Sequence, residues 1–183
     1  MTIIESIKAF GEVQDFIETG LPELAATIAS QDTIAQISNR VIETGIDKDG
    51  DLFSSYSENE VPASSFLGKG YNAGLEAKLK SLSKKGIRIS YKGLRSEAGL
   101  KTAFKNFSFS TEMWKGFGLK RTEHTPKGFT LFLGGKTSYS QDLIDKHSEY
   151  EGVDIIENNK EEADHFEEVF KLEMEDKIKA LLK

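Results

Sequence analysis

The sequence predicts an α+β fold: N-terminal helices, a long extended arm, and a small antiparallel sheet packed with a long C-terminal helix. Three observations support this prediction. Apolar residues recur at three- and four-residue steps near both ends of the chain, residues 45–72 are polar and loop-like, and apolar and polar residues alternate after Asn106. A chain of 183 residues can bury the core of one domain, which we divide into a helical part (1–44), the arm (45–72) and the remainder (73–183).

The N-terminal part is predicted to be helical. Residues 3–18 have apolar side chains on one face, and a second helix is expected from Pro22 to about Glu43. The sequence Gly20-Leu21-Pro22 between them either separates two helices or kinks a single one. Gly45 is expected to end the second helix, because glycine readily adopts the left-handed conformation found at helix C-termini.

The arm begins with GIDKDGDLFSSYSENE, residues 45–60, in which acidic residues occur at alternate positions as in a calcium-binding EF-hand loop. Counting from Asp47 puts Glu58 at position 12, as such a loop requires, but the glycine needed at position 6 is replaced by Leu52. Gly50 lies at position 4, and loop residues follow where the second EF-hand helix should begin. We therefore expect a solvated turn at Asp49-Gly50 and no bound metal.

The remainder of the chain is predicted to contain another helix and then the sheet. Residues 73–85 form the helix, whose lysines are expected to be solvated, and Gly86 ends it. Strands are predicted from the alternation in 107–110 and 114–119 and from the strand-forming residues 129–133, with a hairpin-like turn at 124–128.

Two further helices complete the predicted fold. Ser138 and Gln141 are expected to form a capping box for a helix that ends at Gly152, and residues 153–156 are expected to be a short strand or an extended link. Asn159 and Glu162 are expected to cap the C-terminal helix. The apolar stripe of that helix is predicted to make core or subunit-interface contacts, and it includes Phe166, Phe170, Met174 and Ile178.

The net charge of −6 conceals three blocks of different sign. Residues 1–65 carry 3 basic and 12 acidic side chains, residues 66–136 carry 15 and 4, and residues 137–183 carry 6 and 14. The basic centre either faces nucleic acid or faces the acidic flanks of the same or a neighbouring chain. We favour the second alternative, because a dedicated nucleic-acid-binding domain is usually basic overall.

The sequence lacks the residue patterns of common enzymes and cofactor sites. It contains no cysteine, its three histidines are not at metal-ligand spacing, and no GxSxG, GxxxxGK[ST] or HExxH motif occurs. No window approaches the roughly 20 apolar residues of a membrane span, and the N-terminus lacks a signal-peptide pattern. We therefore expect a soluble, non-enzymatic protein without a cofactor, made in the cytoplasm.

Four segments of the chain, in this order, carry a resemblance to a known family. They are the D-x-DG-x-x-F-x-x-YS segment at 47–57, YKGLR at 91–95, FSFSTEMWKGF at 107–117 and EYEGVDIIE at 149–157. Their order resembles that of the virion morphogenesis proteins of tailed phages, which include neck, head-to-tail joining and tail-completion proteins. The resemblance covers about residues 35–183.

The resemblance implies a ring-forming connector between the portal of the capsid and the tail, located in the virion and assembled in the cytoplasm of the bacterial host. It implies contacts with copies of itself and with neighbouring portal, connector or tail proteins, while packaged DNA passes through the ring without sequence-specific contact. Phe53 and Tyr56 are the implied anchors of the arm, and the other interface candidates are Tyr91, Arg95, Trp114 and Phe117. A head-to-tail contact between oppositely charged surfaces is of the type that closes into rings.

The alternative from a different class is a nucleic-acid-binding protein. It would use the basic segment 66–136, with Tyr91, Trp114 and Phe117 stacking on bases. The affinity of such a protein for DNA should fall steeply as the salt concentration rises.

Overall fold

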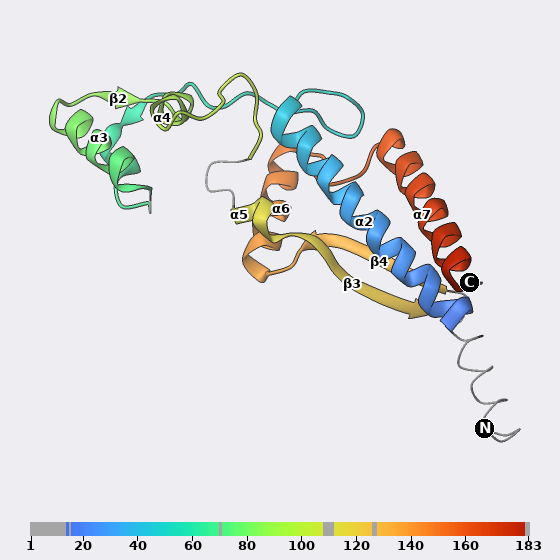
Figure 1. Ribbon diagram of the computed structural model, residues 1–183. Helices are drawn as coiled ribbons and strands as arrows, with labels where there is room; N and C mark the ends of the chain where they lie inside the picture. Colours follow the sequence, from blue (N-terminus) through green and yellow to red (C-terminus); the bar gives the residue numbers. More distant parts are fainter. Residues whose placement is uncertain (1–13, 15, 70, 108–111, 126–127, 182–183) are drawn as a thin grey trace, which may run out of the picture.

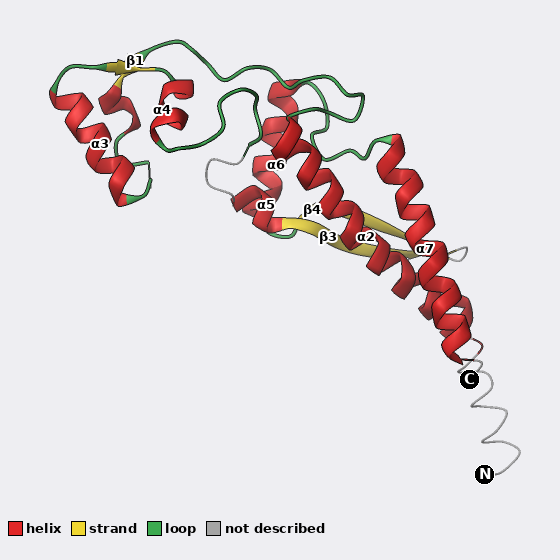
Figure 2. Cartoon of the chain, turned by 45° about the horizontal axis from the view of Figure 1, so that its top comes forward, coloured by secondary structure: helices red, strands yellow, loops and turns green. Residues whose placement is uncertain are grey.

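The computed structural model describes residues 14, 16–69, 71–107, 112–125 and 128–181. Helices and two small antiparallel sheets confirm the predicted α+β fold. The molecule is elongated: a body formed by α2, α5, α6, α7 and the β3–β4 hairpin carries a smaller distal lobe, residues 61–100, at one end (Figure 1). Two loop segments connect the lobe with the body (Figure 2). The helix predicted at 3–18 lies mostly outside the described residues.

A single helical run forms the centre of the body. It consists of a π-helical turn, η1 (Phe16–Gly20), the α-helix α2 (Leu21–Asn39) and a second π-helical turn, η2 (Arg40–Thr44). Gly20 has helical backbone angles, so of the two alternatives left open by the sequence the described residues show a continuous helical run and not two separate helices. Pro22 lies in the first turn of α2, directly after the wider π-helical turn. Proline has no backbone N–H to donate, and this absence is tolerated at the start of the α-helix.

Gly45 ends the helical run, as predicted. Its φ of +68° is left-handed, and its N–H group donates to the carbonyl oxygens of Arg40 and Val41, each at 3.2 Å. A side chain at this position would also collide with its surroundings, because an added Cβ would lie 2.1 Å from the ring of Phe104. Both the conformation and the space therefore require glycine.

The described residues of the distal lobe form two strands and three helices. The strands β1 (Val61–Pro62) and β2 (Arg88–Ile89) are antiparallel, and η3 (Ala63–Phe66) and α3 (Ala73–Lys84) lie between them in sequence. A third helix, α4 (Tyr91–Glu97), follows β2.

The lobe has a hydrophobic cluster of its own. Its buried members are Ala63, Leu75, Leu79, Ile89 and Leu94. The helix predicted at 73–85 is confirmed as α3: the Asn72 side chain accepts from the N–H of Leu75 at its start, and Gly86 is left-handed after its end. Because the lobe buries apolar side chains separately, its position depends on what the two loop segments contact.

The predicted sheet is a two-stranded hairpin of β3 (Phe117–Thr125) and β4 (Gly128–Gly135), with a register shift between Leu119 and Arg121. Of the turn predicted at 124–128, His124 and Thr125 end β3 and Gly128 begins β4, while residues 126–127 lie outside the described residues. The alternation in 114–119 is only partly strand, because Glu112–Gly116 forms the short helix α5 and β3 starts at Phe117. Of the strand predicted at 107–110, Phe107 has a φ of +51° and is not in a strand, and the other residues lie outside the described part of the chain.

The helix α6 (Ser138–Glu151) ends at the left-handed Gly152, as predicted, but its capping box is shifted by one residue. Thr137 and Ser140, not Ser138 and Gln141, exchange the capping hydrogen bonds. The Gln141 side chain instead accepts from the N–H of Gly135 at 3.0 Å. Residues 153–156 form no strand and serve as the link to the next helix.

The C-terminal helix α7 (Lys160–Leu181) packs along α2 (Figure 1). The predicted capping box is confirmed: Asn159 N–H donates to Glu162 Oε2, and Glu162 N–H donates to Asn159 Oδ1, both at 2.8 Å. Glu162 also accepts from Arg40 at the end of α2, from Nε at 2.8 Å and from Nη2 at 3.2 Å. This buried ion pair fixes the start of α7 to the end of α2.

The core of the body lies between α2, α6 and the hairpin. Its buried members are Ile37, Val41, Phe53, Phe107, Met113, Phe117, Ile144 and Ile155. Phe53 comes from the arm and Phe107 from the segment that returns from the lobe, so both loop segments are held by the core of the body.

Candidate interaction surface

The acidic turn at the start of the arm binds its own backbone. Asp47 is buried, and its Oδ1 accepts from the N–H groups of Asp49 at 2.9 Å and Asp51 at 3.0 Å. Gly50, with φ +90°, confirms the predicted turn, and Asp49 and Asp51 are exposed. Among the described residues, no group of three or more His, Asp or Glu side chains is placed to hold a metal ion. The carboxylate that would begin a calcium loop therefore stabilises the turn instead.

Asn106 joins the two loop segments between lobe and body. Its side-chain oxygen accepts from the Tyr56 hydroxyl at 3.1 Å and from Arg95 Nη2 at 2.9 Å, while its backbone N–H donates to the Tyr56 hydroxyl at 3.0 Å. Its side-chain amide donates to Ile42 O at 3.3 Å. Asn106 is 2% exposed, so these bonds are shielded from water.

Arg95 attaches the lobe to Asn106, and Tyr91 attaches it to the neighbouring Tyr56. The Arg95 guanidinium lies 4.2 Å from the Tyr56 ring centroid, and the Tyr56 and Tyr91 rings are 5.7 Å apart. Burial raises the pKa of both Tyr56 and Tyr91, so both rings remain neutral and act as hydrogen-bonding aromatic surfaces. We call Tyr56, Tyr91, Arg95 and Asn106 the clasp.

A buried ion pair reinforces the clasp on the side of the body. Lys105 Nζ lies 2.8 Å from Glu151 Oε1, and Glu151 also accepts from the backbone N–H of Ser54 at 2.8 Å. The side chains of Lys105 and Glu151 are 9% and 3% exposed. The ring of His147 in α6 lies against that of Phe107 in a tilted arrangement, with the ring centroids 4.7 Å apart. Burial lowers the pKa of His147, and the Lys105 ammonium lowers it further, so the imidazole stays neutral beside the cation.

Of the six residues predicted as arm or interface candidates, four are buried and two are half-buried. Phe53 and Tyr56 are buried, and they anchor the arm to the body of their own chain. Arg95 and Phe117 are also buried. Tyr91 and Trp114 are half-buried; the Trp114 ring N–H donates to Asn106 O at 3.2 Å, and its ring lies 5.9 Å from that of Phe117. The structure thus brings these residues together, but in an internal role.

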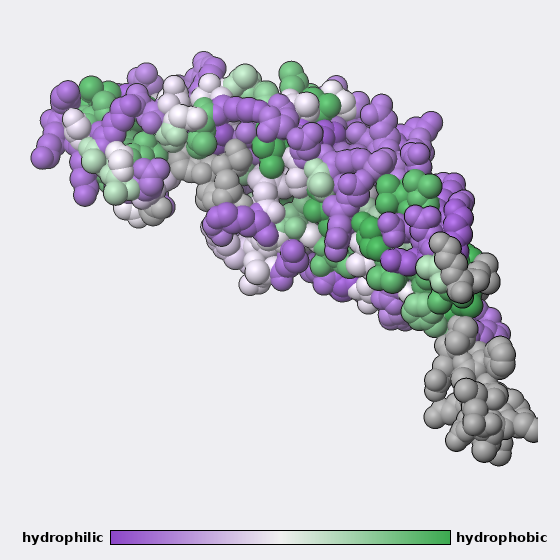
Figure 3. Space-filling view, in the orientation of Figure 1, coloured by the Kyte–Doolittle hydropathy of each residue, from purple (hydrophilic) through white to green (hydrophobic). Residues whose placement is uncertain are grey.

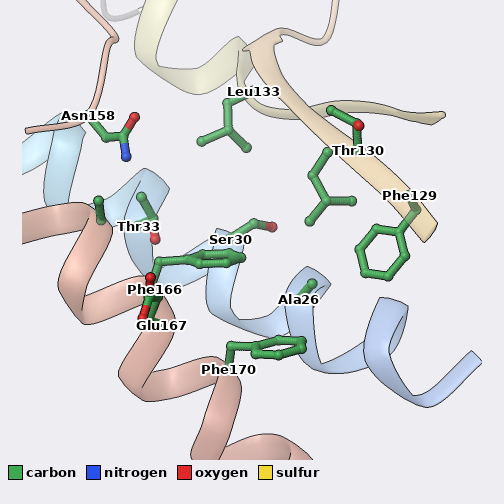
Figure 4. A pocket seen from close by; sticks show the side chains of 12 residues that line it. Ala26, Ser30, Thr33, Phe129, Thr130, Leu133, Asn158, Phe166, Glu167 and Phe170 are labelled. Atoms are coloured by element: carbon green, nitrogen blue, oxygen red, sulfur yellow. The ribbon is translucent and has the colours of Figure 1, made fainter. Parts of the chain in front are cut away.

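An open trough lies on the body between α2, β4 and α7. Phe166 and Phe170 project from α7 toward β4, and the small side chains of α2 form the floor (Figure 4). The rings of Phe166 and Phe170 are stacked, with their centroids 6.3 Å apart. The trough encloses about 600 Å³ and is lined mainly by Ala26, Ser30, Thr33, Phe129, Thr130, Leu131, Leu133, Phe166, Glu167 and Phe170.

Further apolar side chains are exposed at the end of the body where α2 begins and α7 ends (Figure 3). This apolar end comprises Phe16, Ile17, Leu24, Ile178 and Leu181, each at least 40% exposed. The stripe predicted on the C-terminal helix is therefore divided: Phe166 and Phe170 line the trough, Met174 is half-buried, and Ile178 is exposed. Exposed apolar surface of this kind is typical of protein contacts.

The charge blocks of the sequence correspond to separate parts of the molecule. The distal lobe carries eight basic and two acidic side chains. The elements that form the trough have the opposite net charge: apart from Glu162, which pairs with Arg40, α2, β4 and α7 carry nine acidic and four basic side chains. Of these acidic side chains, Glu167 lines the trough itself. One molecule thus presents a basic lobe at one end and, on its body, an apolar trough between elements of net negative charge.

In comparisons with known proteins, no family model, curated protein or solved structure matched the chain. Within the described residues, no helix is long and apolar enough to cross a membrane.

Sequence reasoning missed Asn106, Lys105 and Glu151, which hold the lobe in place. Their contacts join positions that are far apart in the chain, such as Tyr56 with Asn106 and Lys105 with Glu151. The available signal was indirect: Asn106 directly precedes the aromatic segment that begins at Phe107, and it is polar where the predicted strand would start.

Proposed function

We propose that this protein is a structural, non-enzymatic component of a tailed-phage virion, a ring-forming head-to-tail connector, neck or tail-completion protein. The observation that carries the proposal is that one chain has a basic lobe at one end and, on its body, an apolar trough between elements of net negative charge. Two unlike surfaces that complement each other make heterologous contacts between copies, and such contacts close into rings when the rotation permits.

The segments that resemble virion morphogenesis proteins support the proposal by their positions. Residues 47–57 lead from α2 to the clasp, and 91–95 form most of α4 with Tyr91 and Arg95. Residues 107–117 return the chain to the body, and 149–157 lead toward α7. The resemblance therefore falls on the parts that set the position of the lobe relative to the body, which is the property a ring subunit must control.

The positions of the aromatic residues do not favour the nucleic-acid-binding alternative. Stacking on bases requires exposed ring faces, but Phe117 is buried and Tyr91 and Trp114 are half-buried. The exposed lysines of α3 remain available to phosphates. A DNA-binding titration at two salt concentrations separates the alternatives, because nucleic-acid binding through these lysines would weaken steeply with salt.

Deleting the gene from the encoding phage tests the proposed function. We expect the mutant lysate to contain DNA-filled heads and complete tails that remain unjoined, and we expect the wild-type protein supplied from a plasmid to restore joined, infectious particles. Electron microscopy and a plaque assay measure both outcomes. Joined particles of normal infectivity in the absence of the protein would contradict the proposal.

A further inference from the structure

The trough is an apolar surface of the body that no other described element covers. α7 and β4 both lie against α2, and the space between them is lined by apolar side chains from all three elements (Figure 4). The distal lobe of the same chain cannot fill this space, because the lobe is held by the clasp at the other end of α2 (Figures 1 and 2). The described residues of the same chain therefore supply no element that covers the trough.

The distal lobe carries a surface that fits such a site. Ile87, in the turn between α3 and β2, is 41% exposed. Lys84 and Lys85 precede it and Arg88 follows it, and all three side chains are exposed. Lys84 and Lys85 form no ion pair within the part of the chain that the structure describes. The turn thus combines an apolar tip with unneutralised positive charge.

We propose that the Ile87 turn of one copy of this chain docks in the trough of the next copy. Ile87 enters the apolar space near Thr130 and Phe170. The lysines face the net acidic helix α7, where Glu167 lines the trough and also pairs with Lys171 of its own helix at 3.2 Å. This inference rests on the proposed function and identifies the surfaces that would form the ring.

Charge decides between this contact and the symmetric one. Packing trough against trough would place two acidic α7 helices together, and packing lobe against lobe would place two basic surfaces together. The lobe-to-trough contact pairs opposite charges around an apolar centre, which is the usual organisation of a specific interface. Because the contact joins two different surfaces, each copy retains one free lobe and one free trough for further copies.

The absence of native cysteine allows a direct test by disulfide cross-linking of the full-length protein. Ile87→Cys and Thr130→Cys, prepared separately and mixed under mild oxidation, should give a heterodimer containing one copy of each variant. Ile87→Cys mixed with Leu52→Cys is the matched control, since Leu52 is 69% exposed and lies on the turn at the start of the arm, outside the trough. Failure to cross-link, or equal cross-linking in both mixtures, would overturn the proposed contact.

Charge reversal provides a second measurement, made by analytical ultracentrifugation over a range of protein concentrations. We expect Lys84→Glu with Lys85→Glu to weaken self-association by about tenfold or more, and Glu167→Lys to weaken it in the same direction. Mixing the two variants should restore part of the loss. Lys146→Glu, which changes an exposed lysine on α6, is the control and should have no comparable effect.

The outcomes separate the docking inference from the proposed function. A wild-type protein that stays monomeric at every concentration overturns the inference, as does self-association that is insensitive to the lobe and trough variants. In either case the gene-deletion experiment still decides whether the protein joins heads to tails. Conversely, normal particles in the deletion mutant would contradict the proposed function. The contact between copies would then be judged by the cross-linking result alone.

Discussion

Replacing Glu162 by alanine should remove much of the stability of the body. Arg40 and Glu162 form a two-point ion pair with side chains only 8% and 5% exposed, so the substitution leaves a buried guanidinium without its carboxylate. Breaking one partner of such a pair costs about 3–5 kcal/mol. The lost hydrogen bond from the Asn159 N–H adds about 1 kcal/mol. The expected loss of about 4–6 kcal/mol is comparable with the total unfolding free energy of many domains.

Urea unfolding followed by the fluorescence of the single tryptophan, Trp114, measures this loss. Glu161→Ala is the matched control, because Glu161 is the exposed neighbour on the same turn and should change the unfolding free energy by less than about 0.5 kcal/mol. A loss below about 1 kcal/mol for Glu162→Ala, or equal losses for both variants, would refute the view that this pair fixes α7 to α2.

Three further changes test the arm and the clasp by the same unfolding assay. Tyr56→Phe removes the hydroxyl bonded to Asn106 and should cost about 1–3 kcal/mol; no loss would contradict the clasp. Gly45→Ala combines left-handed strain with a collision and should cost about 2–5 kcal/mol, whereas Gly50→Ala, left-handed but with open space, should cost about 1–2 kcal/mol. Burial lowers the pKa of His147 in the folded protein, whereas in the unfolded protein this pKa returns to its ordinary value of about 6.5. Unfolding at a pH below about 6.5 is therefore accompanied by protonation of His147. The unfolding free energy should therefore fall between pH 7 and 5, and His147→Gln should reduce that fall; an unchanged slope would contradict it.

Local signals in the sequence predicted the helices well. The capping box of Asn159 and Glu162 and the left-handed Gly45, Gly86 and Gly152 appear where short-range rules place them, because caps and turns depend on neighbouring residues. The continuity across Gly20 was not predictable in the same way. Glycine allows a helix to continue as well as to end, and packing of the run against α7 and the hairpin favours continuation.

The site could be predicted only in part. Residues at 53, 56, 91 and 95 were singled out as arm or interface candidates, and the structure brings Tyr56, Tyr91 and Arg95 into one cluster. Tyr56 and Arg95 are joined by Asn106, which lies 50 positions from Tyr56 in sequence and was not singled out. The trough was not foreseen because its walls come from α2, β4 and α7, and only their arrangement in space leaves room between them.

The proposed function, a connector in a tailed-phage virion, is tested most directly by electron cryomicroscopy of the head-to-tail junction in purified particles. We expect a closed ring of copies of this chain around the DNA channel, with the distal lobe of each copy seated on the body of its neighbour. A junction that contains no copy of this chain would contradict the connector role.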